Sequence, residues 1–349
     1  MPEPTPQLRD HTTLRLGGPA RRWVRATTEA ELIEAVTTAD QAGEAVLVLG
    51  GGSNVVVADV GFPGTVVEVA TTGIHPDVED GTSCGGVMVR VAAGESWDHL
   101  VAVAVARGWV GVEALSGIPG AVGATPIQNV GAYGQEVAQT IAAVRVWDRQ
   151  LRGVRTFANA DCGFGYRHSR FKADRFDDVG GRHVVLDVTF QLPQGTLGAP
   201  VAYAELARTL GVDIGGRAPL ADVRAAVLGL RAGKGMVLDP VDHDTWSAGS
   251  FFTNPVVDPA AVPEGAPAWE QPDGRLKTSA AWLIEHAGFT KGYGNGTARL
   301  SSKHTLALTN RGDATAEDLL GLAREIRYGV EAAYGIRLVN EPVLVGCEL

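Results

Sequence analysis

Two glycine-rich segments of the sequence have the composition of loops that hold an anion. The first, residues 50–54, reads Gly-Gly-Gly-Ser-Asn and directly follows the apolar run 45–49. Three consecutive glycines let the backbone adopt positive φ angles, so that successive N–H groups can converge on a phosphate. Ser53 and Asn54 add side-chain donors. Taken alone, this segment could equally be an ordinary glycine turn.

The second glycine-rich segment, residues 117–136, reads GIPGAVGATPIQNVGAYGQE. Its first glycines remove side chains from a surface that something approaches closely, and Gln128 and Asn129 offer amides for a ring edge or a phosphate. The sequence contains no G-x-x-x-x-G-K-[ST] and no G-x-G-x-x-G that opens a helix. A dinucleotide site here would therefore belong to a fold other than the P-loop or Rossmann folds.

Composition and charge narrow the class of protein. The 349 residues indicate two or three domains at about 100–200 residues each. A formal net charge of −10 argues against a nucleic-acid partner, and no apolar run is long enough to span a membrane. Three widely spaced cysteines and the absence of a signal peptide favour the cytoplasm. The eight histidines lack H-x-x-x-H and H-x-H spacing, so we expect no metal site. We also expect a monomer rather than an oligomer.

Helical and strand patterns alternate irregularly along the chain. Capping signals and apolar periodicity predict helices, one of them with the Thr28-x-x-Glu31 capping box, at 29–42, 97–107, 220–231, 279–286 and 316–334. Short apolar runs predict strands at 45–49, 55–58, 64–69, 87–92, 143–147, 184–190 and 306–309. We also expect an N-terminal arm over 1–13 and a turn that enters a strand over 246–254. Because there is no sustained βαβ repeat, the pattern predicts an α+β fold rather than one doubly wound sheet.

Taken together, the two glycine-rich segments resemble the UDP-N-acetylenolpyruvoylglucosamine reductase family, also called UDP-N-acetylmuramate dehydrogenase or MurB. The resemblance continues, in the family's order, with Tyr166-Arg167, Gly249-Ser250-Phe251-Phe252, Asn254-Pro255 and Leu338-x-x-Glu341. It covers residues 12–346, nearly the whole chain. Tyr203 in Tyr-Ala-Glu-Leu looks like the Tyr-x-x-Leu loop of the type I subclass, which folds over the UDP.

The resemblance implies a fold and a reaction. The fold is a PCMH or vanillyl-alcohol-oxidase-type FAD-binding module of two subdomains over 12–195, followed by a substrate-binding α+β domain over 200–349. The last strand, 336–349, would return to the FAD lobe. In the reaction, NADPH reduces FAD, and the flavin reduces the enolpyruvyl group of UDP-N-acetylenolpyruvoylglucosamine to give UDP-N-acetylmuramate, a peptidoglycan precursor.

The resemblance also implies catalytic residues. Arg167 would stabilise the enolate that forms after hydride transfer, Ser250 would donate the proton, and Glu341 would orient Arg167 or water or assist proton delivery. Each has a plainer interpretation: a surface Arg in the basic run 167–172, a serine in a turn, and a solvated carboxylate at a strand end. Arg231 and Lys234 similarly fit a helix C-terminus, which favours positive charge.

The remaining implied site residues contact cofactor or substrate. The cofactor-binding set is Gly50, Gly51, Gly52, Ser53, Asn54, Gly117, Ile118, Pro119, Gly120, Gly123, Ala124, Gln128, Asn129, Gly131, Tyr133, Gly134 and Arg231. The substrate-binding set is Tyr133, Tyr166, Arg167, Tyr203, Lys234, Ser250 and Asn254. Thr253 stands where many relatives carry Lys, which puts a fine contact in doubt, and His304 receives no role.

Two alternatives stay open at this point. An oxidase of the same FAD fold would consume oxygen, and a non-catalytic UDP-sugar-binding protein would carry little or no flavin.

Overall fold

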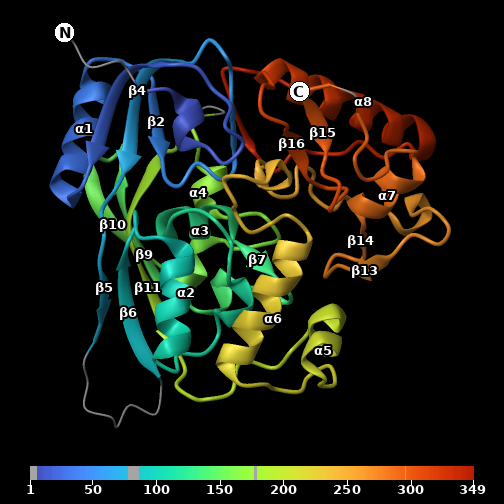
Figure 1. Ribbon diagram of the computed structural model, residues 1–349. Helices are drawn as coiled ribbons and strands as arrows, with labels where there is room; N and C mark the ends of the chain where they lie inside the picture. The colour runs from blue at the N-terminus through green and yellow to red at the C-terminus, as the bar shows by residue number, and fades with distance from the viewer. Residues whose placement is uncertain (1–5, 78–85, 177–178, 295) are drawn as a thin grey trace. The chain divides into compact units, whose positions relative to one another are not determined.

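The computed structural model describes residues 6–77, 86–176, 179–294 and 296–349, and its chain forms two compact units (Figure 1). Unit 1 comprises Met1–Ala20, Gly52–Phe62 and Lys234–Leu349, and unit 2 comprises Arg21–Gly51 and Pro63–Gly233. Residues 200–233 therefore group with the middle of the chain, whereas the predicted domains divide it at 195–200. The functional assignment of those domains stays a prediction.

Within its described residues, unit 2 contains a three-stranded sheet, a five-stranded sheet and the short β7–β8 pair, and most of its helices are short. Its helices are α1 (Glu29–Gln41), α2 (Trp97–Ala106), α3 (Thr125–Gln128), α4 (Arg170–Ala173), α5 (Ala204–Leu210) and α6 (Leu220–Gly233). Its 3₁₀ turns are η2 (Glu113–Leu115), η3 (Val122–Ala124), η4 (Val137–Gln139) and η5 (Asn159–Cys162). Its strands are β1 (Ala20–Ala26), β2 (Val46–Leu49), β4 (Phe62–Val69), β5 (Ile74–Pro76), β6 (Val87–Ala92), β7 (Gly131–Ala132), β8 (Gln135–Glu136), β9 (Ile141–Asp148), β10 (Gly153–Ala158) and β11 (His183–Leu192).

The three-stranded sheet of unit 2 has the strand order β1-β4-β2, with β2 and β4 parallel. Helix α1 packs beside it and begins at the predicted capping box, in which the Thr28 side chain accepts from the Glu31 N–H and the Glu31 carboxylate accepts from the Thr28 N–H. Its buried residues Leu32 and Val36 join the apolar cluster that also holds Val46 and Val67. The sheet thus ends, at Leu49, directly before the first glycine-rich segment.

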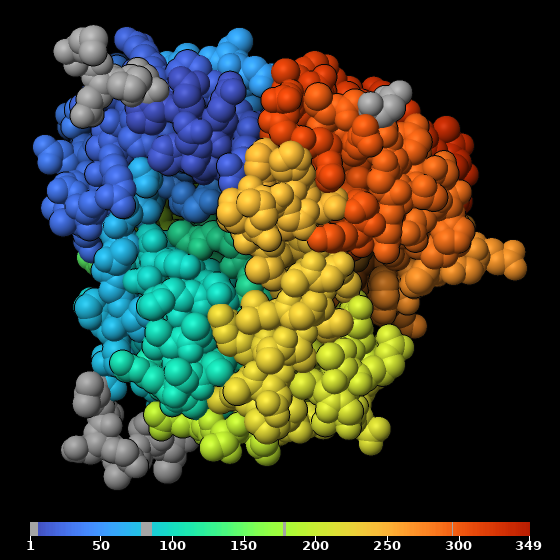
Figure 2. Space-filling model, in the orientation of Figure 1, coloured from blue at the N-terminus to red at the C-terminus, as the bar shows by residue number. Residues whose placement is uncertain are grey.

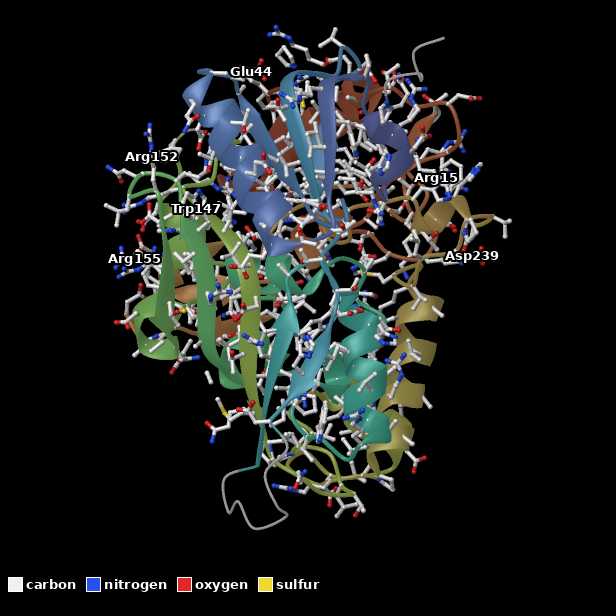
Figure 3. The ribbon with its side chains drawn as sticks, turned by 90° about the vertical axis from the view of Figure 1, so that its left-hand side faces the viewer. Arg15, Glu44, Trp147, Arg152, Arg155 and Asp239 are labelled. Carbon is white, nitrogen blue, oxygen red and sulfur yellow. The ribbon has the colours of Figure 1, made fainter. Side chains whose placement is uncertain are left out.

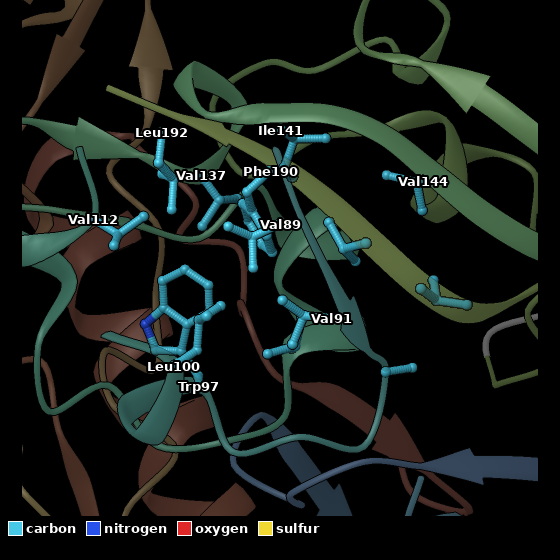
Figure 4. Close-up of a cluster of buried hydrophobic side chains, with 14 of the residues drawn as sticks. Val89, Val91, Trp97, Leu100, Val112, Val137, Ile141, Val144, Phe190 and Leu192 are labelled. Carbon is cyan, nitrogen blue, oxygen red and sulfur yellow. The ribbon is translucent and has the colours of Figure 1, made fainter. Parts of the chain in front are cut away.

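The larger sheet of unit 2 is antiparallel throughout, with the order β10-β9-β11-β6-β5. Helix α2 covers one face, and the side chain of Trp97 at its start is fully buried (Figure 4). The Trp97 ring packs 6.0 Å from the ring of Phe190 on the central strand β11, and its Nε1–H donates to the Leu115 carbonyl at 3.0 Å. This core therefore ties the start of α2 to Leu115, two residues before the second glycine-rich segment.

The β9–β10 hairpin is closed by the buried carboxylate of Asp148. Figure 3 labels three other residues of this hairpin, Trp147, Arg152 and Arg155. Asp148 accepts two hydrogen bonds from the Arg182 guanidinium, at 2.7 and 3.0 Å, and two from turn N–H groups, including that of Leu151. Burial acts to raise the pKa of Asp148, but these hydrogen bonds outweigh it and lower the pKa to about 2.

Helices α5 and α6 complete unit 2. Figure 2 shows α5, in yellow-green, against α6, in yellow, at the surface of this unit. They enclose a small apolar cluster with Ala114, Val201, Leu206 and Val227. Because Ala114 belongs to η2, this cluster ties the helix pair to the turn that precedes the second glycine-rich segment.

Unit 1 is built around helix α8 (Ala316–Tyr334). Its other helices and turns are η1 (Leu8–His11), η6 (His243–Thr245), η7 (Pro259–Ala261) and α7 (Ala280–His286). Its strands are β3 (Val55–Val57), β12 (Val256–Val257), β13 (Ala268–Glu270), β14 (Leu276–Thr278), β15 (Ala298–Leu300), β16 (Leu308–Asn310) and β17 (Val343–Val345). The last strand, β17, pairs parallel with β3, so the chain's end returns to the segment just after the first glycine-rich loop.

Most predicted elements are confirmed, including the α+β class, and two predictions are wrong. Helix α8 has the predicted bounds, and its predicted stripe of Leu319, Ala323, Ile326 and Val330 is buried. The N-terminal arm is wrong over its described part, because Leu8 is buried within η1; residues 1–5 lie outside the described residues, as does Cys84. The strand within 246–254 is wrong, because only an isolated bridge joins Phe252 to Asn340.

Among the described residues, no helix combines the length and the apolar character needed to cross a bilayer.

The Asp148 carboxylate should make stability depend on pH in a defined window. Because its folded pKa of about 2 lies below the ordinary 3.8, its contribution is present above pH 4 and is lost as pH falls toward 2. We expect Asp148→Asn to lower the free energy of unfolding at pH 7 by about 2 kcal/mol. The deficit should shrink between pH 4 and pH 2 in chemical denaturation, with the exposed Asp213→Asn as control. A deficit that is constant with pH would contradict this assignment.

Candidate functional site

The two glycine-rich loops touch each other within unit 2. A Cβ atom on Gly51 would lie 2.6 Å from the Cα of Gly120, closer than real Cβ contacts come. At the neighbouring Gly50, a Cβ would make an ordinary 3.4 Å contact with Ala121. The glycine at 51 is therefore required by the close approach of two backbones.

The first loop passes from unit 2 into unit 1 between Gly51 and Gly52. Gly52 has a φ of +60°, and a Cβ there would lie 1.9 Å from the His11 carbonyl oxygen. The carbonyl of Gly52 accepts from the Thr13 N–H at 3.1 Å. A glycine at 52 is therefore demanded both by its backbone conformation and by the N-terminal segment packed on it.

The second loop is hydrogen-bonded to the turn between β6 and α2. The Gly120 carbonyl accepts from the Trp97 N–H at 3.0 Å, and the Gly123 N–H donates to the Ala93 carbonyl at 2.7 Å. A Cβ on Gly123 would lie 2.6 Å from the Ala93 Cβ, so this glycine permits the pairing. The start of α2 thus positions the loop's glycines through backbone hydrogen bonds.

Asn129 and Gln128, at the end of α3, are buried and bonded within the protein. The Asn129 amide donates to the Glu136 carboxylate and the Gly165 carbonyl at 3.0 and 2.9 Å. The Gln128 carbonyl oxygen accepts from Lys172 Nζ at 3.1 Å. Both side chains shape the loop, and their predicted contacts with a cofactor stay predictions.

The guanidinium of Arg167 lies on the second loop. Its Nη2 donates to the Gly131 carbonyl at 3.1 Å and its Nη1 to the Asn129 carbonyl at 3.4 Å. Its backbone has a φ of 52°, an uncommon conformation for a side-chain-bearing residue, and Lys172 Nζ donates to its carbonyl at 3.2 Å. The guanidinium of Arg167 also lies 5.6 Å from the ring centroid of Tyr166. The structure therefore brings Arg167 and the loop together.

An ion pair and a buried cation lie near the start of the second loop. The Gly117 N–H donates to Asp98 at 2.6 Å, and Asp98 also pairs bidentately with Arg224 at 2.7 and 2.8 Å. The hydrogen bond from Arg224 is the main cause that lowers the pKa of Asp98. Arg231 on α6 is buried, and its burial lowers its pKa, against the favourable charges of Tyr133 and Asp98. A buried cation beside a glycine loop suits an anionic ligand.

Tyr133 and Tyr203 form an edge-to-face pair, with ring centroids 5.4 Å apart and an interplanar angle of 86°. Tyr133 has a φ of 50°, and Tyr203 stands at the N-terminus of α5 with 44% of its surface exposed. The next residue of the loop, Gly134, has a φ of 86°, and a Cβ there would lie 2.8 Å from that of Ala202. The two predicted substrate-binding tyrosines are thus neighbours in unit 2.

In unit 1, the segments of Ser250 and Glu341 are joined by backbone pairing. The Glu341 N–H donates to the carbonyl of Phe251, the residue after Ser250, at 2.8 Å. The Asn54 side chain, at the end of the first loop, donates to the Glu341 carbonyl at 3.4 Å. Phe251 is buried in the core of unit 1, which holds Ser250 in a half-buried position. Ser250, Glu341 and Asn54 therefore belong to one cluster.

The other predicted residues of unit 1 are held differently. Asn254 accepts from the Ala280 N–H at the start of α7 at 3.0 Å. Thr253 pairs with the Val339 carbonyl through its backbone N–H at 3.0 Å and its hydroxyl at 3.3 Å. Lys234 is the first residue of the C-terminal segment of this unit and is half-buried.

Several residues that support the site were not predicted from the sequence. Asp98, Glu113, Ser169 and Lys172 hold the second loop or the Arg167 segment through side-chain hydrogen bonds. Only Lys172 carried a sequence signal, as the last residue of the basic run 167–172. The others bond to partners that are distant in sequence, so no local pattern marks them.

Two family models match the chain. Residues 20–152 match an FAD binding domain, and residues 239–345 match the C-terminal domain of UDP-N-acetylenolpyruvoylglucosamine reductase. The first range contains both glycine-rich loops, and the second contains Ser250 and Glu341.

Whole-chain relatives have the same name as the second family model. A UDP-N-acetylenolpyruvoylglucosamine reductase of Cutibacterium acnes is 59% identical, over 97% of this chain and 89% of that protein. One of Streptomyces avermitilis is 58% identical, over 97% and 93%. The crystal structure of UDP-N-acetylenolpyruvylglucosamine reductase from Thermus caldophilus is 27% identical, covers 97% of each chain and has a TM-score of 0.66.

The contact between the loops predicts opposite outcomes for two adjacent glycines. Gly51→Ala should force the loops apart, because its Cβ meets the Gly120 backbone, whereas Gly50→Ala adds only an ordinary contact. We expect the Gly51 variant to lose most of its bound flavin and the Gly50 variant to retain it. The ratio of absorbance at 450 nm to that at 280 nm in the purified proteins measures this. Equal flavin content in the two variants would mean that the contact does not shape the site.

Proposed function

Because this chain belongs to the UDP-N-acetylenolpyruvoylglucosamine reductase family, we propose that it reduces the enolpyruvyl group of UDP-N-acetylenolpyruvoylglucosamine. It is an FAD-dependent oxidoreductase. In the proposed reaction NADPH supplies the electrons, and the product is UDP-N-acetylmuramate, for peptidoglycan synthesis. The observation that carries the proposal is the pairing of Glu341 with Phe251, which joins the Ser250 and Glu341 segments of the family's motifs.

The loops suit a dinucleotide with a diphosphate. Gly51 and Gly120 present bare backbone, Ser53 and Asn54 carry donors, and buried Arg231 adds a positive charge near the second loop. We assign these residues to FAD. When bound, FAD would supply the redox chemistry that links NADPH to the alkene of the substrate.

In the proposed mechanism Arg167 stabilises charge. Hydride addition to one alkene carbon leaves negative charge on the other, and this charge delocalises into the adjacent carboxylate. A guanidinium stays protonated and can grip a carboxylate with two parallel hydrogen bonds. The bonds of Arg167 to the Asn129 and Gly131 carbonyls support this role, since they hold the guanidinium in one place.

Ser250 is the proposed proton donor, and Glu341 assists it. A serine hydroxyl is a weak acid, so it can deliver a proton only to a strongly basic carbon and only in a fixed position. The Phe251–Glu341 hydrogen bond supports that requirement, because it ties the backbone next to Ser250 to a second strand. The Glu341 carboxylate is proposed to orient water or to assist proton delivery.

The proposed function predicts a two-step spectral change in the purified protein. Under anaerobic stopped-flow conditions, NADPH should bleach the flavin absorbance near 450 nm, and UDP-N-acetylenolpyruvoylglucosamine should then restore it. A protein without bound flavin would instead be a binding protein, and reoxidation only by oxygen would indicate an oxidase. A bound flavin that NADPH cannot reduce would contradict the proposal.

Removing the hydroxyl of Ser250 should affect only the second step. We expect Ser250→Ala to leave flavin reduction by NADPH intact and to slow reoxidation by the substrate by about 10²–10⁴-fold, the usual contribution of a positioned acid. Thr290→Ala, which removes an exposed hydroxyl in the same unit, serves as control. An unchanged rate of reoxidation in the Ser250 variant would rule out its role as proton donor.

A further inference from the structure

A fully buried carboxylate, that of Glu113, lies at the start of η2 in unit 2. Its oxygens accept three hydrogen bonds: from the Gly111 N–H at 2.6 Å, from the Ala199 N–H at 2.6 Å and from Gln135 Nε2 at 2.9 Å. These donors come from three separate stretches of chain. The carboxylate therefore links the turn before the second loop, the far end of that loop, and the segment that leads to α5.

Two neighbours of Glu113, Gln135 and Gly198, support these hydrogen bonds to its carboxylate. Gln135 returns a bond to the same turn, because its side-chain carbonyl accepts from the Ala114 N–H at 2.8 Å. A Cβ on Gly198 would lie 2.9 Å from Glu113 Oε1, so a glycine there lets the chain approach the carboxylate closely enough for the Ala199 bond. A buried acceptor that satisfies three donors at once is costly to replace, since each donor would be left without a partner.

The two outer partners of Glu113 lead directly to the tyrosine pair. Gln135 follows Tyr133 by two residues in the second loop, and Ala199 precedes Tyr203 by four. Leu206, just beyond Tyr203, packs in the apolar cluster with Ala114, the residue after Glu113. The Glu113 turn thus anchors the segments on both sides of the Tyr133–Tyr203 contact. Tyr203 remains 44% exposed in that contact.

We propose that Glu113 is a positioning residue for the nucleotide end of the substrate. Its carboxylate holds Gln135 and Ala199 together and so sets the edge-to-face geometry of Tyr133 and Tyr203. The inference rests on the proposed function, which assigns these tyrosines to binding of the UDP-sugar. Glu113 itself does not touch the reacting atoms, so its effect belongs to substrate binding rather than to hydride or proton transfer.

The test is Glu113→Gln, which keeps the shape but replaces one acceptor oxygen with an NH₂ donor. That NH₂ must face the Gly111 N–H or the Ala199 and Gln135 donors, so at least one hydrogen bond is lost. We expect the KM for the UDP-sugar to rise about tenfold, which corresponds to about 1.4 kcal/mol. The rate of flavin reduction by NADPH, the flavin content and kcat should stay within about twofold. The same change at an exposed position, Glu34→Gln on α1, should alter none of these.

A double-mutant cycle separates positioning from general loosening of the fold. Tyr203→Ala alone should raise the KM for the UDP-sugar, and adding Glu113→Gln should then raise it by no more than about twofold. Fully additive effects on KM, or an unchanged KM in Glu113→Gln, would overturn the proposal. If Glu113→Gln does not fold, Gly198→Ala enters the same cycle, because its Cβ would displace the same carboxylate. Failure of the proposed function would be distinguishable, since the unmodified protein would then fail to reoxidise its flavin with the UDP-sugar.

Discussion

The approach of Gly51 to Gly120 is the contact on which the predicted cofactor site depends. Two loops from different parts of unit 2 meet there because Gly51 has no side chain; a Cβ on Gly51 would lie only 2.6 Å from the Gly120 Cα and would force the loops apart. Each loop is anchored by neighbouring structure. The first loop directly follows strand β2, and the second is hydrogen-bonded to the segment that joins β6 to α2. Bare N–H groups can converge on an anion only because these rigid elements hold both loops.

Three carboxylates do much of the positioning in unit 2; those of Glu113 and Asp148 are buried, and that of Asp98 is partly exposed. Asp98, Glu113 and Asp148 each accept hydrogen bonds from backbone N–H groups, and Asp98 and Asp148 also pair with an arginine. Each accepts from an N–H group of a turn or loop, so one acidic side chain can satisfy N–H groups that no helix or strand serves. In a glycine-rich chain with many turns, such carboxylates fix loops that backbone hydrogen bonds alone would leave poorly specified.

In unit 1, the segments of Ser250 and Glu341 are held in place by backbone pairing rather than by carboxylates. Their segments are joined by short backbone pairing over the core of Phe251 and α8, and β17 is paired with β3. As the proposed proton donor, a serine with a weakly acidic hydroxyl needs a fixed position more than it needs a shifted pKa. Backbone pairing next to it, above a close-packed core, meets that need.

The sequence by itself determined the features that arise within a few residues. The capping box of α1, the apolar stripe of α8 and the glycine-rich loops all depend on neighbours in the chain, so their patterns could be recognised directly. Family motifs added the candidate roles of Arg167, Ser250 and Glu341. Only the tertiary structure decided that Gly51 meets Gly120, that Glu113 joins Gln135 to Ala199, and that residues 246–254 form no strand. These depend on contacts between residues far apart in sequence, and such contacts have no local signature because they exist only once the chain has closed around its cores.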